Sequence, residues 1–144
     1  CGIGAHSTAA GEDVIKDIMT MGEATGIAFQ IKDDLFDYGD NKVGKPTGID
    51  IVEKKMTLPL IYALNAADKS ERRHIIRIIK KDKKSKNQIA EVISFVKEKG
   101  GIEYAQTRMM EYKSKAQKLL NNIKTESSTE YLNALIDYVI ERKK

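Results

Sequence analysis

The sequence predicts an all-α protein, and three observations support this fold class. Hydrophobic residues recur with a period close to 3.6 along almost the whole chain, which is the spacing of amphipathic helices. No segment alternates apolar and polar residues convincingly, as a half-buried strand does, and no Asn-Gly or Asp-Gly pair indicates a tight hairpin turn. The 144 residues, 41% of them hydrophobic, suffice for one domain with its own core, and no internal linker divides them.

The first half of the chain contains one long helix between a short helix and a loop. We expect helical structure over residues 1–9 and a long helix from Glu12 to Tyr38. A loop rich in Gly and Lys follows, over residues 39–55. The next helix, residues 58–67, is predicted to begin with Thr57 as N-cap and Pro59 in its first turn.

The second half is predicted to contain helices only. Ser85 and Ser128 are the expected N-caps of two of them, and Gly100-Gly101 is typical of a helix stop. The four predicted helices span residues 70–81, 86–99, 101–124 and 128–142.

Composition excludes several classes of function. The net charge of +4 is mild, and the lysine-rich residues 80–86 are interpreted as a solvated loop, so nucleic-acid binding is not expected. No apolar run approaches the ~20 residues that cross a bilayer. The single cysteine, Cys1, cannot form an internal disulfide, which predicts a cytoplasmic protein. The chain starts without Met or a signal peptide, so we expect a fragment of a longer protein.

Three aspartates near the end of the long helix form a candidate metal site. Asp33 and Asp37 lie about 40° apart on a helical wheel, and Asp34 lies beside them. These carboxylates repel one another, and a helix C-terminus disfavours negative charge, so a hard cation would relieve both penalties. Mg²⁺ suits the arrangement because it takes one or two carboxylates together with water and phosphate oxygens. A solvated acidic helix end is the alternative interpretation.

The same helical face is apolar in its first half. Ile15, Met19, Gly22 and Gly26 continue the stripe on which Asp33 lies. Apolar side chains are unexpected on a solvated face, and glycine allows close approach to the backbone. We therefore expect these four residues to line an apolar cavity with the carboxylates at its mouth.

The loop after this helix carries two lysines that suit a phosphate ligand. Lys45 and Lys55 bracket a stretch that contains Gly44, Gly48 and Asp50. Lysine binds phosphate as a point charge, and glycines let the backbone close around it. Alone, this would be an ordinary surface loop. Beside the aspartates, it predicts the second half of a metal and diphosphate site.

The motif as a whole resembles the second aspartate-rich region of the trans-isoprenyl diphosphate synthases, the polyprenyl synthetase family. The resemblance runs in order from Gly26 to Asp37, through Gly44-Lys45 and Asp50, to residues 54–59. Residues 100–105 and 116–120 are similar to the family's C-terminal helices, and Lys54 stands where glycine is usual. The family's first aspartate-rich motif and isopentenyl-binding residues are absent from the sequence. The resemblance thus implies that residues 1–144 are the C-terminal fragment of a single polyprenyl synthase domain, part of the isoprenoid synthase helical bundle.

The resemblance also implies a function. The full-length enzyme would use Mg²⁺ to ionise an allylic diphosphate and join it to isopentenyl diphosphate, making a trans-polyprenyl diphosphate, with a homodimer as the family habit. The fragment alone would be inactive, and product length is not specified by these residues. The matching positions assign metal binding to Asp33, Asp34 and Asp37, substrate binding to Gln30, Lys45 and Lys55, and supporting roles to Phe29 and Asp50.

Two alternatives remain open at this point. One is a non-catalytic subunit or helical interaction partner of a prenyltransferase, although such a subunit has no physical need for a repulsive carboxylate cluster. The other is an unrelated helical module with a chance acidic patch. A class I terpene cyclase is not indicated, because its second motif of Asn, Ser or Thr and Glu is not found.

Overall fold

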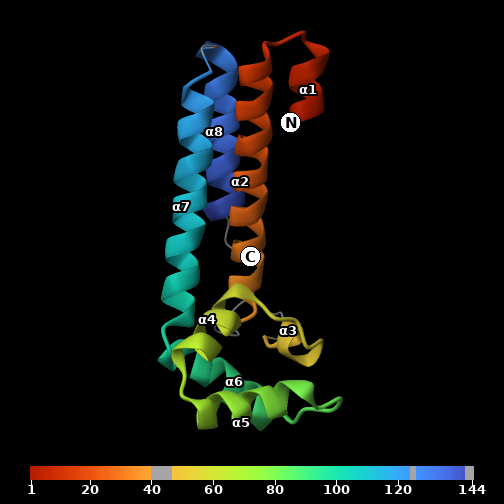
Figure 1. Ribbon diagram of the computed structural model, residues 1–144, viewed down its shortest axis with the longest axis vertical. Helices are drawn as coiled ribbons and strands as arrows, with labels where there is room; N and C mark the ends of the chain where they lie inside the picture. Colours follow the sequence, from red (N-terminus) through yellow and green to blue (C-terminus); the bar gives the residue numbers. More distant parts are fainter. Residues whose placement is uncertain (40–46, 124–125, 142–144) are drawn as a thin grey trace. The chain divides into compact units, whose positions relative to one another are not determined.

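The computed structural model describes residues 1–39, 47–123 and 126–141. All regular structure within these ranges is helical, which confirms the all-α prediction (Figure 1). No helix in the described part of the chain is long and apolar enough to cross a membrane. In chain order the helices are α1 (Gly2–Ser7), α2 (Glu12–Phe36), α3 (Ile49–Val52), α4 (Leu58–Ala66), α5 (Lys69–Lys80), α6 (Lys86–Glu98), α7 (Gly101–Asn121) and α8 (Glu126–Glu141).

Most predicted helix ends agree with these bounds, and three predictions were wrong. The long helix α2 ends at Phe36 rather than Tyr38, so Asp37 lies beyond it. Helix α3 was not predicted, because four residues are too few for a helical period to be visible. Ser128 lies inside α8, which begins at Glu126, so Ser128 is not its N-cap.

Two helices begin with reciprocal capping boxes. Asp68 accepts hydrogen bonds from the N–H groups of Ser70 and Glu71 at the start of α5, and Glu71 caps in return. Ser85, the predicted N-cap of α6, forms the same arrangement with Gln88. These local signals explain why both starts could be predicted within a residue.

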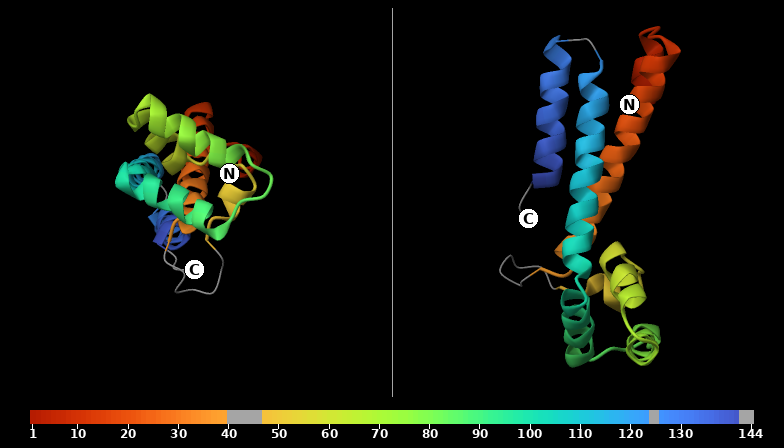
Figure 2. Two further views of the ribbon diagram at one scale, coloured as in Figure 1. Left: turned by 90° about the horizontal axis from the view of Figure 1, so that it is seen from below. Right: turned by 60° about the vertical axis from the view of Figure 1, so that its left-hand side comes forward.

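The chain divides into two compact units. Unit 1 comprises residues 1–30 and 108–143, with α1, most of α2, much of α7 and all of α8. Its three long helices lie side by side, and α7 runs antiparallel to both α2 and α8 (Figures 1 and 2). Its apolar core is formed by Met21, Ala24, Ala28, Met109, Ala116, Leu120, Ile136 and Ile140.

A buried cation joins two helices of unit 1. Lys113 lies in the buried stripe of α7, and its Nζ pairs with Asp137 at 2.7 Å and Glu141 at 2.6 Å on α8. Burial alone would lower the pKa of Lys113, but hydrogen bonds to these carboxylates raise it. The lysine therefore stays charged and ties α7 to α8.

Unit 2 comprises residues 31–107, with the end of α2, helices α3 to α6 and the start of α7. Helix α6 contacts α3, α4 and α5, and so forms the centre of the unit. The rings of Tyr62 and Tyr104 stack with centroids 4.1 Å apart. The core consists of Tyr38, Ile51, Leu60, Ala63, Leu64, Ile75, Ile78, Ile79, Val92, Phe95 and Val96.

At the predicted helix stop, Gly100 has a positive φ and Gly101 lies against the backbone of α4. Gly100 has φ +73° after α6 ends, a conformation that glycine adopts without strain. Gly101 begins α7 against the backbone of α4: a Cβ placed there would lie 2.4 Å from the carbonyl oxygen of Pro59. Only glycine allows this contact between the two helices.

We expect Gly101→Ala to lower the free energy of unfolding by about 1–3 kcal/mol, because the methyl group would force α4 and α7 apart. The matched control is Gly26→Ala, where a Cβ would meet nothing within 4 Å. Alanine there should stabilise α2 by about 0.5–1 kcal/mol. Chemical denaturation measures both. Equal changes in the free energy of unfolding for the two substitutions would contradict the close contact between Gly101 and the Pro59 carbonyl oxygen.

Candidate functional site

The three predicted metal-binding aspartates are not equivalent in the structure. Asp33 is exposed and Asp34 is half-buried on the last turn of α2. Asp37 lies past the helix end and is only 9% exposed. Within the described residues, no three His, Cys, Asp or Glu side chains gather as a metal-ion site. Asp33 and Asp34 lie on the helix and Asp37 lies beyond it, and the metal-binding role of all three stays a prediction.

The Asp37 side chain binds the start of α3. Its Oδ1 accepts the N–H of Ile49 at 2.9 Å, and its Oδ2 accepts the N–H of Asp50 at 3.1 Å. The N–H of Gly48 donates to the Asp37 carbonyl oxygen at 3.0 Å. Helix N-termini carry unpaired N–H groups and a positive dipole end, so a carboxylate is a strong cap there. Asp37 therefore holds α3 against the end of α2.

The pKa of Asp37 is raised from its ordinary value. Burial is the larger cause and the nearby Asp50 carboxylate the second, while the N–H groups of Ile49, Asp50 and Gly48 act in the opposite direction. The site thus keeps Asp37 in an environment that penalises negative charge, and backbone donors offset part of that penalty.

Tyr38, the residue after Asp37, forms a second contact that holds this segment. The hydroxyl groups of Tyr38 and Thr57 lie 2.6 Å apart, and both residues are buried. Burial raises the pKa of Tyr38, so it stays protonated. Thr57 is the N-cap residue of α4, as predicted, but its side chain caps no N–H of that helix. Consecutive residues after α2 thus hold both ends of the segment from Gly48 to Thr57.

Lys55 lies on this tethered segment, next to two carboxylates. Its Nζ lies 2.7 Å from Glu53 and 3.0 Å from Asp50. The hydrogen bond that Lys55 donates to Glu53, followed by the one it donates to Asp50, raises the pKa of Lys55, so its charge is retained. The Lys55 N–H also donates to the Asp50 carbonyl oxygen at 2.8 Å. The structure therefore places two of the predicted site residues, Lys55 and Asp50, in contact, and adds Glu53.

Lys54, which replaces the family's usual glycine, has a left-handed backbone. Its φ is +60°, a conformation that is strained for every residue with a Cβ. Its side chain pairs with Asp82 at 2.6 Å. The backbone at position 54 thus has the left-handed conformation that glycine adopts without strain, although the residue is lysine.

Two further residues of the predicted site, Phe29 and Gln30, lie on α2. Phe29 is half-buried and Gln30 is exposed, the latter being the last residue of unit 1 before the chain enters unit 2. Lys45 lies outside the described residues.

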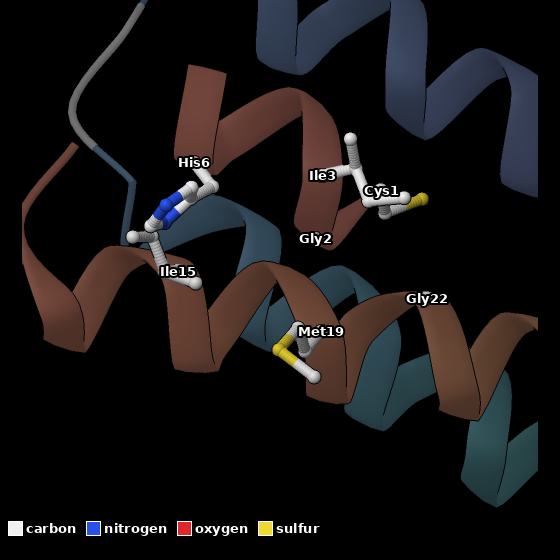
Figure 3. Close-up of a pocket in the computed structure, with 7 residues that line it drawn as sticks. All are labelled: Cys1, Gly2, Ile3, His6, Ile15, Met19 and Gly22. Carbon is white, nitrogen blue, oxygen red and sulfur yellow. The ribbon is translucent and has the colours of Figure 1, made fainter. Parts of the chain in front are cut away.

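The predicted apolar stripe lines a groove in unit 1. Ile15, Met19 and Gly22 form one wall, and α1 forms the other, enclosing about 640 Å³ (Figure 3). Gly22 lies close to Cys1, since a Cβ at Gly22 would be 3.2 Å from that of Cys1. Gly26 lies one turn further along α2 and is not part of this lining. Three of the four predicted residues therefore share one cavity.

Comparison with known proteins identifies the family. The sequence profile of the polyprenyl synthetase family matches residues 1–96. The chain belongs to the polyprenyl synthetase family. This membership excludes an unrelated helical module.

Individual relatives of this polyprenyl synthetase chain support its membership of the family. Geranylfarnesyl diphosphate synthase from Aeropyrum pernix is 37% identical over 99% of the chain and 45% of its own length. The crystal structure of geranylgeranyl pyrophosphate synthase from Bacteroides thetaiotaomicron matches with a TM-score of 0.87 and 41% identity, over 98% of this chain and 47% of that one. The enzyme of that name from Corynebacterium glutamicum, complexed with calcium and isoprenyl diphosphate, matches with a TM-score of 0.82 and 25% identity, over 98% and 44%. The chain thus spans less than half of the relatives it matches.

Sequence reasoning missed Tyr38 and Glu53, and it missed the hydrogen bonds of Asp37 to the start of α3. The metal-binding role of Asp37 stays a prediction. Gly48 precedes α3 as its N-cap residue with φ +83° and has no side chain to cap the helix, so the carboxylate of Asp37 supplies the acceptors.

We expect Asp37→Ala to destabilise the protein by about 2–3 kcal/mol without any metal present, because two backbone N–H groups lose a charged partner. The matched control is Asp33→Ala, an exposed aspartate of the same motif, which should change stability by less than about 0.5 kcal/mol. Urea denaturation in the presence of a chelator measures both. Equal, small effects would mean that Asp37 has no structural role.

We expect Lys54→Gly to be more stable than Lys54→Ala by about 1 kcal/mol, because both remove the pair with Asp82 but only glycine relieves the left-handed strain. Thermal denaturation of the two variants side by side measures this difference. An alanine variant as stable as the glycine variant would contradict the backbone conformation of this loop.

Proposed function

We propose that this chain forms the diphosphate-binding half of a trans-isoprenyl diphosphate synthase. In the full-length enzyme the allylic C–O bond would break, with its electron pair leaving on the diphosphate. The double bond of isopentenyl diphosphate would then attack the allylic carbon, and loss of a proton would restore an alkene. The observation that carries this proposal is the tethering of the Lys55 segment to the end of the helix that presents Asp33 and Asp34.

The chain's own residues would bind and orient the leaving group. Lys55 stays protonated beside Asp50 and Glu53, so it can donate to diphosphate oxygens as charge leaves the allylic carbon. Because the segment is fixed at both ends, the ammonium group is positioned before substrate arrives, which lowers the entropic cost of binding. Gln30 and Lys45 complete the proposed substrate contacts, with Phe29 in a supporting role.

The donors on α2 fit Mg²⁺. Carboxylate oxygens are hard ligands, and Mg²⁺ is commonly held by one or two of them together with water and substrate phosphate. Asp33 and Asp34 supply this number, while Asp37 is engaged by α3. When bound, the ion would neutralise charge developing on the departing diphosphate. A relative's complex with calcium and isoprenyl diphosphate supports a divalent ion beside this substrate class.

The groove of unit 1 suits the apolar part of an isoprenoid. Ile15 and Met19 provide apolar surface, and Gly22 keeps the groove open. We assign these residues, with Gly26 further along, to the path of the growing chain. A homodimer and a cytoplasmic location remain part of the proposal for the full-length enzyme. The named relatives are synthases, which favours this function over a non-catalytic subunit.

The proposal predicts that Mg²⁺ with inorganic diphosphate stabilises these 144 residues. At ten times the dissociation constant, binding should raise the unfolding midpoint by about 3–6 °C. Asp33→Ala and Lys55→Ala should each abolish most of this rise, because each removes a ligand-binding group. Differential scanning calorimetry, with Mg²⁺ alone as a reference, measures it.

The matched control is Lys115→Ala, an exposed lysine of α7 outside the site, which should keep the rise. An unchanged rise in the Asp33 and Lys55 variants, or no rise in the parent chain, would contradict the proposal. We also expect no elongation of an allylic diphosphate by these residues alone, since they carry one acidic motif, and measurable turnover would refute that expectation.

A further inference from the structure

The positive charge of the protein is concentrated in one segment. Residues 69–86 contain nine Lys or Arg and two acidic residues, a net charge of +7 in a chain whose total is +4. The other 126 residues therefore carry −3 together. This asymmetry singles out α5 and the loop to α6 (Figure 1).

The outer side of α5 is uniformly basic. Lys69, Arg73, Arg77 and Lys80 are all exposed and fall within about 80° on the helix. The opposite side is buried in the core of unit 2, through Ile75, Ile78 and Ile79. The apolar side of α5 is therefore committed to the fold, and only its cations are available to a partner.

The loop after α5 extends the same surface. Lys81 and Lys83 are exposed in the loop between α5 and α6, and Lys86 is exposed at the first position of α6. The two helices lie side by side (Figure 2). The half-buried Lys84 fixes the loop, since its Nζ donates to the carbonyl oxygens of Lys81 at 2.8 Å and Val52 at 3.3 Å. We define the basic face as Arg73, Arg77, Lys80, Lys81, Lys83 and Lys86.

These cations are not neutralised within the fold. No ion pair among the described residues involves Arg73, Arg77 or Lys80, whereas His74, on the flank of α5, pairs with Glu91 at 2.6 Å. The one acidic residue of the loop, Asp82, is paired with Lys54. Uncompensated like charges repel one another, so a surface of this kind is stabilised by an external anion.

We propose that the basic face is a docking surface for an anionic lipid bilayer. Clusters of four to eight Lys or Arg on an amphipathic helix are typical of surfaces that bind anionic headgroups, each cation strengthening binding about fivefold. Because the apolar side of α5 is buried, the contact is electrostatic and involves no insertion into the acyl chains. The proposal does not depend on the catalytic role of Asp33 or Lys55.

Charge alone would also attract nucleic acid, but the composition of this surface favours lipid. Single-stranded nucleic acid is bound by aromatic side chains interleaved with cations, because bases stack on them. Residues 66–91 contain no Phe, Tyr or Trp. The basic face thus offers positive charge but no aromatic side chains on which bases could stack, and this suits the anionic headgroups of a bilayer.

The test is flotation of the 144-residue chain with vesicles of phosphatidylcholine alone or mixed with phosphatidylglycerol, at low and high salt. We expect binding to the mixed vesicles only, and its loss at high salt. Removing three cations, as Arg73→Gln, Arg77→Gln and Lys80→Gln together, should weaken partitioning about a hundredfold. The matched control makes the same charge change with Lys16→Gln, Lys115→Gln and Lys118→Gln, all exposed elsewhere, and should bind nearly as the parent chain does.

A second variant guards against misfolding of α5. Lys81→Gln with Lys83→Gln alters only the loop and should weaken binding about thirtyfold, while circular dichroism verifies helix content in every variant. No binding to mixed vesicles, or equal loss in the control, would overturn the proposal. Binding of a single-stranded RNA oligonucleotide that needs the basic face, without vesicle binding, would overturn it in favour of nucleic acid.

Discussion

The carboxylate of Asp37, which accepts the N–H groups of Ile49 and Asp50, is the interaction on which the arrangement of the site depends. It fixes a four-residue helix that could not persist alone, because nucleating one helical turn is unfavourable. With the Tyr38 hydroxyl bound to Thr57, it limits where the segment carrying Lys55 can lie. The end of α2 therefore positions the segment from Gly48 to Thr57 as well as presenting carboxylates.

The three aspartates of the motif differ in their surroundings. Asp33 and Asp34 face outward or half-outward on the helix, where they can meet a ligand. Asp37 is buried, in an environment that raises its pKa, and its oxygens are occupied by backbone donors. Acidic residues that look alike in sequence thus lie in different environments because α2 ends between Asp34 and Asp37. The strained Lys54 and the ion pair of Lys55 with Asp50 belong to the same fixed segment.

Much of this was predictable from sequence, and the exceptions have physical causes. Local signals are strong where a cap and a hydrophobic period coincide, as at Ser85, and there the predicted helix start was confirmed. Ile15, Met19 and Gly22 of the predicted stripe line a groove with α1, while their role toward a prenyl chain stays a prediction. Asp37 could not be assigned to α3 in this way, because its partners lie twelve and thirteen residues away and α3 is shorter than a period. The lysine at position 54 was recognised as a departure from glycine, but only the backbone revealed the strain it carries.

The most direct test of this account is amide hydrogen exchange at Ile49 and Asp50, followed by NMR in the chain without metal. We expect both amides to exchange slowly in the parent chain and much faster in Asp37→Asn, which keeps one acceptor oxygen but loses the charge. The Lys99 amide, whose hydrogen bond to Phe95 is far from Asp37 in sequence, should exchange equally in both. Unprotected Ile49 and Asp50 amides in the parent chain would contradict the claim that Asp37 organises the site.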